Sequence, residues 1–151
     1  MVHSHLSINN AVAKHRIVAA LNMHAPEINL LFAWIWVLAG FASGLVMGLF
    51  FDRENWLGGY TALRRRLFRL AHISFFGLGA INLMYYFTAR YALAPSPLQC
   101  LAAWGFVLGG VTMPLVCLIM ARWSKAKMLF AVPVMSLLGA GALTIWELIR
   151  I

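Results

Sequence analysis

Residues 28–51 read INLLFAWIWVLAGFASGLVMGLFF, and the fold can be argued outward from them. The stretch carries no charge, and Asn29 and Ser43 are its two clearly polar residues. About 20 consecutive apolar residues are enough for a helix to cross the hydrocarbon layer of a membrane. A helix of a water-soluble bundle would carry a polar face, which this stretch lacks. The stretch therefore predicts a membrane-spanning helix.

Three further apolar runs follow the first and are separated by short charged connections. They cover residues 67–89, 98–121 and 128–149. Hydrophobic residues make up 63% of the 151-residue chain and charged residues 11%. Soluble domains contain about 45–50% apolar and about 25% charged residues. We therefore predict an all-α fold, a polytopic membrane protein whose residues 25–151 form one four-helix transmembrane bundle.

Residues 1–24 precede the first run and are polar to amphipathic. Ile8 and Val12 belong to a ragged apolar side, which fits a short helix lying on the membrane surface. A disordered tail is the alternative interpretation. The segment carries Lys14 and Arg16 but lacks the short apolar core and the cleavage site of a secretory signal. We expect the first span to remain in the mature protein.

The charges indicate how the spans are oriented. The net charge is +8, and because the cations lie at the ends of the apolar runs, we expect the partner to be the lipid bilayer and not nucleic acid. Eight cations lie around the connections after the first and third runs: Arg53, Arg64, Arg65, Arg66, Arg69, Arg122, Lys125 and Lys127. The opposite side holds four: Lys14, Arg16, Arg90 and Arg150. The positive-inside rule then places loops 52–66 and 122–127 in the cytoplasm and both termini in the periplasm, in a bacterial inner membrane.

Glycines recur every four residues in the first run, at Gly40, Gly44 and Gly48. This spacing lays a groove of small residues along one face of a helix, which lets a second helix approach closely. The pattern therefore predicts helix packing. The partner is either another helix of this chain or a second subunit.

His72 lies about one turn inside the second run. Together with Gly79, Asn82 and Tyr86 it forms a polar stripe along one side of the predicted helix. A polar stripe facing lipid is costly, so we expect it to face the bundle interior. One interpretation of His72 is a hydrogen bond to a neighbouring helix. The alternatives are haem or copper ligation, a proton relay or a quinone contact.

Pro114 and Pro133 fall at similar depth in the third and fourth runs, on the side of the basic loops. A proline inside a helix frees the carbonyl four residues earlier, here on Gly110 and Leu129. Freed carbonyls inside a membrane need partners or a wet cavity. One hypothesis is a small cavity whose imidazole, thioether and thiol groups suit copper or haem iron, lined by His72, Met113, Cys117 and Met135. The alternative is that both helices kink and repack, with methionines filling the gaps.

Glu147 is the only acidic residue well inside a predicted span. It precedes Arg150 by three residues, so the two side chains can pair along the helix. The alternative is a coupling carboxylate of a small, oligomeric, proton-coupled transporter.

The sequence carries no catalytic signature. It has no H-E-x-x-H, no G-x-S-x-G and no phosphate-binding loop. Cys100 and Cys117 are about 25 Å apart along one helix, so they cannot form a disulfide within the chain. The leading hypothesis is a non-catalytic accessory subunit or assembly factor of a larger membrane complex, which contacts other membrane subunits or itself. The alternatives are a redox-linked protein binding haem, copper or quinone near His72, and the transporter above.

Overall fold

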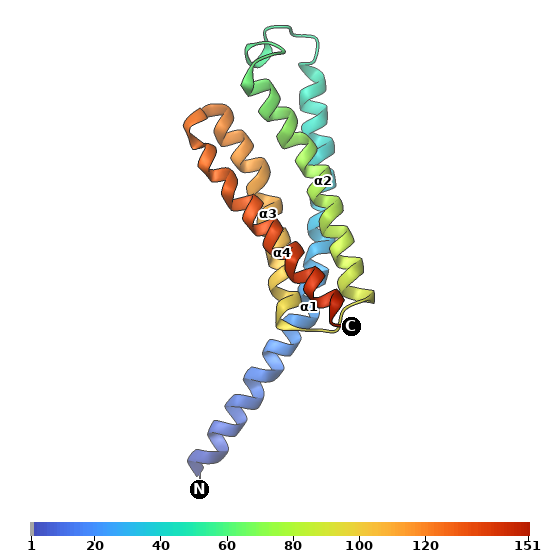
Figure 1. The fold of residues 1–151 in the computed structure, drawn as a ribbon, viewed down its shortest axis with the longest axis vertical. Coiled ribbons are helices and arrows are strands. Elements are labelled where there is room, and N and C mark those ends of the chain that lie inside the picture. The colour runs from blue at the N-terminus through green and yellow to red at the C-terminus, as the bar shows by residue number, and fades with distance from the viewer. Residues whose placement is uncertain (1) are drawn as a thin grey trace.

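The computed structural model describes the backbone of residues 2–151 and the side chains of residues 26–123 and 125–151. Within this part of the chain every regular element is helical, as Figure 1 shows. The elements are α1 (Val2–Leu49), the 3₁₀ turn η1 (Trp56–Gly58), α2 (Leu63–Tyr91), α3 (Pro97–Arg122), the 3₁₀ segment η2 (Ser124–Phe130) and α4 (Ala131–Ile149).

Four stretches are long and apolar enough to cross a membrane: Pro26–Leu49, Leu63–Tyr91, Pro97–Arg122 and Lys125–Ile149. The predicted all-α class and its four spans are therefore confirmed. The largest difference in a boundary is four residues, at the start of the second span, where 63 replaces the predicted 67. The difference arises because the first turn of α2 contains Arg64, Arg65 and Arg66, which are charged and so do not belong to an apolar run.

The backbone of residues 2–25 continues the first span as one helix, because α1 begins at Val2 and contains Pro26. This part of α1 projects beyond the rest of the bundle (Figure 1). Residues 2–24 therefore have a helical backbone, and their location on the membrane surface stays a prediction.

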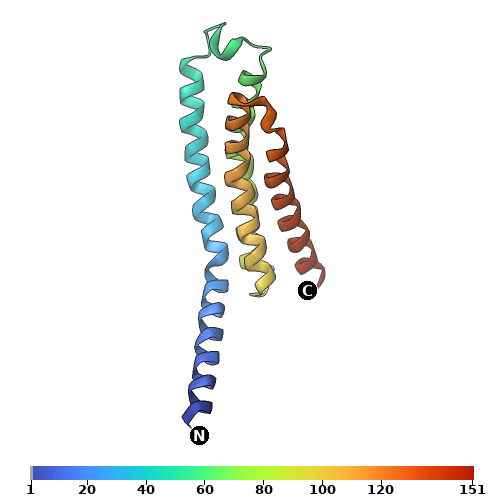
Figure 2. The same cartoon turned by 90° about the vertical axis from the view of Figure 1, so that its left-hand side faces the viewer.

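Helices α1, α2 and α3 pack against one another and form a three-helix core. Within the described residues, the backbone of α4 lies close to that of α3 and η2 only. Figure 2 shows α4 as an outer helix beside α3. The architecture is thus a three-helix core with a fourth helix attached to one member.

The connections place the helix ends on two opposite sides. The segments that join α1 to α2 and α3 to α4 lie at one end of the bundle, and the C-terminus lies at the other (Figures 1 and 2). At the second end, Ser96 caps α3 by accepting a hydrogen bond from the backbone N–H of Gln99 at 3.0 Å. A serine cap followed by Pro97 at the first helical position begins a helix firmly.

Candidate functional site

Two asparagines, Asn29 of α1 and Asn82 of α2, lie at the centre of the three-helix core and are both 0% exposed. Asn29 Nδ2 donates to Asn82 Oδ1 at 2.7 Å and to the carbonyl of Ala103 at 3.1 Å. Asn82 Nδ2 donates to the carbonyl of Leu78 at 2.8 Å and to that of Phe106 at 3.4 Å. Because a buried amide is costly without hydrogen bonds, this asparagine pair joins α1, α2 and α3 at one level.

A single turn of α3 receives side chains from the other three helices. Its carbonyls at Ala103 and Phe106 accept from the asparagine pair. Between them, the carbonyl of Gly105 accepts from Ser136 Oγ of α4 at 2.7 Å. A carbonyl oxygen has two lone pairs, so it can accept a side-chain donor in addition to its helical N–H.

Asn29 Oδ1 is buried and has no hydrogen-bond partner among the described residues. An unpaired buried acceptor costs about 1–3 kcal/mol, so the asparagine pair is only partly satisfied. An amide neither gains nor loses a proton near neutral pH. The asparagine pair therefore offers hydrogen bonds and no acid–base group.

The carbonyl that Pro114 frees has found a partner. Trp36 Nε1 of α1 donates to the carbonyl of Gly110 at 3.1 Å. The indole is held in place by stacking on Phe32, with ring centroids 4.1 Å apart. Thus α1 supplies the donor that α3 lacks.

Pro133 is fully buried but lies in the first turn of α4, two residues after Ala131. The first backbone N–H groups of a helix have no intrahelical acceptor, so a proline there removes no helical hydrogen bond. The carbonyl of Leu129 accepts from the backbone N–H of Ala131. Pro133 is thus compatible with the first turn of α4, which follows directly after η2.

His72 of α2 faces α1. Its Nδ1 is 2.9 Å from Ser43 Oγ, and its ring meets that of Phe76 edge-on with centroids 5.5 Å apart. A Cβ added at Gly44 would be 3.0 Å from His72 Cε1. This is the arrangement of a histidine that ties two helices together.

The other three residues of the predicted metal cavity lie on α3 and α4. Cys117 is 0% exposed and Met113 is half-buried, whereas Met135 is 66% exposed on α4. The contacts of His72 described above go to α1 and to its own helix. Among the described residues, no group of three or more His, Cys, Asp or Glu side chains lies close enough to hold a metal ion. A haem or copper site at His72, Met113, Cys117 and Met135 stays a prediction.

The remaining polar residues predicted within the spans are Tyr86 and Glu147. Tyr86 is half-buried and packs edge-on against Phe87, with centroids 5.3 Å apart. Glu147 is half-buried near the end of α4, and the guanidinium of Arg150 lies 5.9 Å from the centre of the Trp146 ring.

Two of the three predicted packing glycines face α2. A Cβ at Gly40 would be 2.7 Å from Phe76 Cζ, and Gly44 faces His72 as described above. Nothing lies within 4 Å of a Cβ added at Gly48. The glycine groove therefore serves contacts inside the chain at its first two positions.

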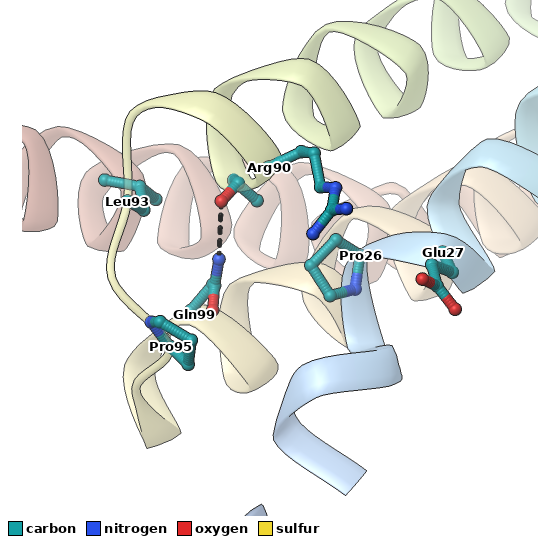
Figure 3. A pocket seen from close by; sticks show the side chains of 7 residues that line it. Pro26, Glu27, Arg90, Leu93, Pro95 and Gln99 are labelled. Carbon is teal, nitrogen blue, oxygen red and sulfur yellow. Dashed lines mark hydrogen bonds between the residues drawn. The ribbon is translucent and has the colours of Figure 1, made fainter. Parts of the chain in front are cut away.

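A pocket of about 170 Å³ opens at the end of the bundle that carries the C-terminus (Figure 3). Its wall includes Gln99, whose Nε2 donates to the carbonyl of Ala89 at 3.0 Å. Tyr85 OH of α2 donates to the backbone carbonyl of Gln99. The rest of the pocket wall is formed by Pro26, Glu27, Ala89, Arg90, Leu93 and Pro95. Gln99 thus joins the start of α3 to the last turns of α2 through two hydrogen bonds.

Arg65 is the buried member of the arginine cluster, at 3% exposure. Its Nη2 donates to the carbonyl of Phe51 at 3.1 Å, and its guanidinium lies 3.7 Å from the centre of the Tyr60 ring and 5.7 Å from that of Trp56. Its Nη1 is buried without a partner among the described residues. Arg65 therefore joins the start of α2 to the segment that leaves α1.

Sequence reasoning predicts no contact between helices for Asn29, Trp36, Arg65 or Gln99. A signal existed for Asn29, because it is one of two polar residues in a 24-residue apolar run. For Trp36 the signal was its indole N–H, which a membrane interior leaves without water. No family model, curated protein or solved structure matches this chain. Its function is therefore inferred from the geometry of the bundle.

Proposed function

We propose that this chain is a non-catalytic integral membrane component, an accessory subunit or assembly factor of a larger membrane complex. The observation that supports it best is the use of the polar side chains inside the bundle. Amides, a hydroxyl and one indole bind backbone carbonyls or one another across helix contacts, at Asn29, Asn82, Trp36 and Ser136. His72 is engaged in the same way with Ser43. Such groups fix how helices pack and leave little for chemistry.

The surface of α4 offers room for a helix of a partner subunit. Small residues leave open space there, since nothing lies within 4 Å of a Cβ added at Gly139 or Gly141. Apolar grooves of about 480 Å³ and about 240 Å³ flank the helix, the first lined by Gly139 and the second by Gly141. In lipid, helices associate through close backbone approach at small residues. We propose that a helix of another subunit packs on α4.

We also propose that the protein resides in a bacterial inner membrane with loops 52–66 and 122–127 in the cytoplasm and both termini in the periplasm. The support is the distribution of Lys and Arg: eight lie at the end of the bundle with the two loops, and four lie at the opposite end.

The partner can be tested by site-specific photo-crosslinking in the native membrane. A photoreactive residue replaces Leu138 or Ile145 on α4, which are 63% and 59% exposed. The matched controls replace Leu38 or Leu45 on α1, which are 66% and 68% exposed. We expect a discrete protein adduct from the α4 positions and lipid adducts alone from the α1 positions.

Two results would contradict the proposed contact of α4 with another subunit. One is lipid labelling alone from all four positions, together with a monodisperse monomer after extraction in mild detergent. The other is an adduct between two copies of this chain, which would make α4 a self-association surface.

A further inference from the structure

Two exposed arginines lie on α2 near its start. Arg66 and Arg69 are both exposed, and we call them the arginine pair. They are three residues apart, so their side chains are neighbours on the helix surface. No Asp or Glu occurs between Glu54 and Glu147, and α2 has no acidic residue in its first turn. The start of α2 therefore presents concentrated positive charge.

Arg65, the neighbour of the arginine pair on α2, is buried. The guanidinium of Arg65 is held between the carbonyl of Phe51 and the ring of Tyr60. Successive residues of a helix point about 100° apart, as the 3.6-residue turn requires. On this spacing Arg66 points about 100° away from Arg65 and Arg69 about 40° away from it, and the side chains of both Arg66 and Arg69 are exposed.

An apolar groove of about 320 Å³ runs between α1 and α2 farther into the bundle. We call it the α1–α2 groove, and its lining residues are Ala33, Trp34, Val37, Phe76, Gly79, Ala80 and Leu83. Residues 69, 76, 80 and 83 recur at spacings of seven, four and three, which places them on one side of a helix. Arg69 therefore stands above the groove on the same side of α2.

The separation between charge and groove matches one leaflet of a bilayer. Arg69 and Ala80 are eleven positions apart, and at 1.5 Å per residue this is about 17 Å along the helix. Half of a hydrocarbon core of about 30 Å is about 15 Å. A lipid with its headgroup at Arg69 would therefore place an acyl chain alongside Ala80.

We propose that the α1–α2 hairpin binds one anionic phospholipid from the leaflet on the loop side, with its phosphate on Arg66 and Arg69 and one acyl chain in the α1–α2 groove. Guanidinium groups suit phosphate because their N–H donors match its oxygens. The apolar lining of the groove suits the chain. This site is independent of the proposed subunit contact on α4.

The site can be tested with the full chain purified in mild detergent and titrated with dioleoyl-phosphatidylglycerol or dioleoyl-phosphatidylcholine, with bound lipid counted by native mass spectrometry. We expect phosphatidylglycerol to bind more tightly. The double variant R66Q/R69Q should bind phosphatidylglycerol about 30-fold more weakly, from about fivefold per lost cation. Ala80→Trp, which fills the groove and keeps both arginines, should weaken it about tenfold or more.

The control is Arg122→Gln, which removes one exposed charge from the loop end of α3 and should change binding by less than about twofold. R66K/R69K keeps the charge and should retain most of the binding. Equal binding of the two lipids, or unchanged phosphatidylglycerol binding in either R66Q/R69Q or Ala80→Trp, overturns the proposal. Displacement of the lipid by millimolar inorganic phosphate also overturns it, because the arginine pair would then hold a soluble anion.

Discussion

Single side chains decide how this bundle is held together, because inside a membrane water cannot replace a missing hydrogen bond. Asn29 and Asn82 place four amide polar atoms where the surroundings are otherwise apolar, and one of them, Asn29 Oδ1, is unpaired. Removing one partner leaves the other unsatisfied, whereas removing both leaves an apolar contact. The pair therefore behaves as a unit in a mutant series.

We expect Asn82→Leu to lower the free energy of unfolding by about 1–3 kcal/mol, because Asn29 Nδ2 loses the acceptor of its shorter hydrogen bond, Asn82 Oδ1. The double variant N29L/N82L should be less destabilised than the sum of the two single changes. Thermal unfolding in detergent, followed by size-exclusion chromatography, measures all three. Thr88→Val is the control, since the Thr88 hydroxyl bonds only within its own helix, to Met84. Strict additivity would show that the two amides act separately.

Trp36 and Pro114 form a second coupled pair. Trp36→Phe keeps a ring on Phe32 but removes the donor to the carbonyl of Gly110, and should cost about 0.5–1.5 kcal/mol. In a Pro114→Ala background the restored backbone N–H can bind that carbonyl, so Trp36→Phe should be nearly neutral there. The same unfolding assay measures the difference. An equal loss in both backgrounds would mean that Trp36 acts through packing and not through its N–H.

At the level of the helices, close approach at glycine sets the contacts of α3 with α4. A Cβ at Gly109 would be 2.5 Å from Leu137 Cγ, and a Cβ at Gly105 would be 2.9 Å from Ala140 Cβ. Neither neighbour atom is the free end of a long side chain. The two helices therefore cannot keep this separation if either glycine gains a side chain.

We expect Gly109→Ala to destabilise the protein by about 1–3 kcal/mol, because α4 must move outward to relieve the overlap. Gly139→Ala, on the open side of α4, should change stability little or raise it by up to about 1 kcal/mol through higher helix propensity. Cysteine pairs across α3 and α4 would report the movement through a slower cross-linking rate. Comparable behaviour of the two variants would show that α4 is not held at this contact.

The helices and their order follow from apolar run length, which is a local property of the sequence. Which helices touch is not local. Gly40 and Gly44 were expected to face a helix, but only the fold assigns that helix to α2. Pro133 was placed inside a run, but only the observed start at Ala131 makes it a first-turn proline. Likewise, Asn29 and Asn82 are 53 residues apart, and a bond between them depends on tertiary packing.

At the level of the whole molecule, charge distribution predicts orientation. A reporter active only in the periplasm should be active when fused after Ile151 and silent when fused after Trp123 at the loop end. A reporter that needs the cytoplasm should give the opposite pattern. Replacing the four exposed cations Arg53, Arg64, Arg66 and Arg69 with glutamine should reduce the bias, since it removes half of the eight. Periplasmic activity after Trp123 in the natural sequence would reverse the assignment.

The turn of α3 that spans Ala103 to Phe106 gives the bundle one mechanical junction. Side chains of α1, α2 and α4 all bind its carbonyls, while the backbone of α4 comes close to no other core helix. A force that pulled α4 sideways would therefore act on the same turn of α3 that holds the amides of α1 and α2. Stiffening or loosening that turn would change how strongly α4 is coupled to the buried amides.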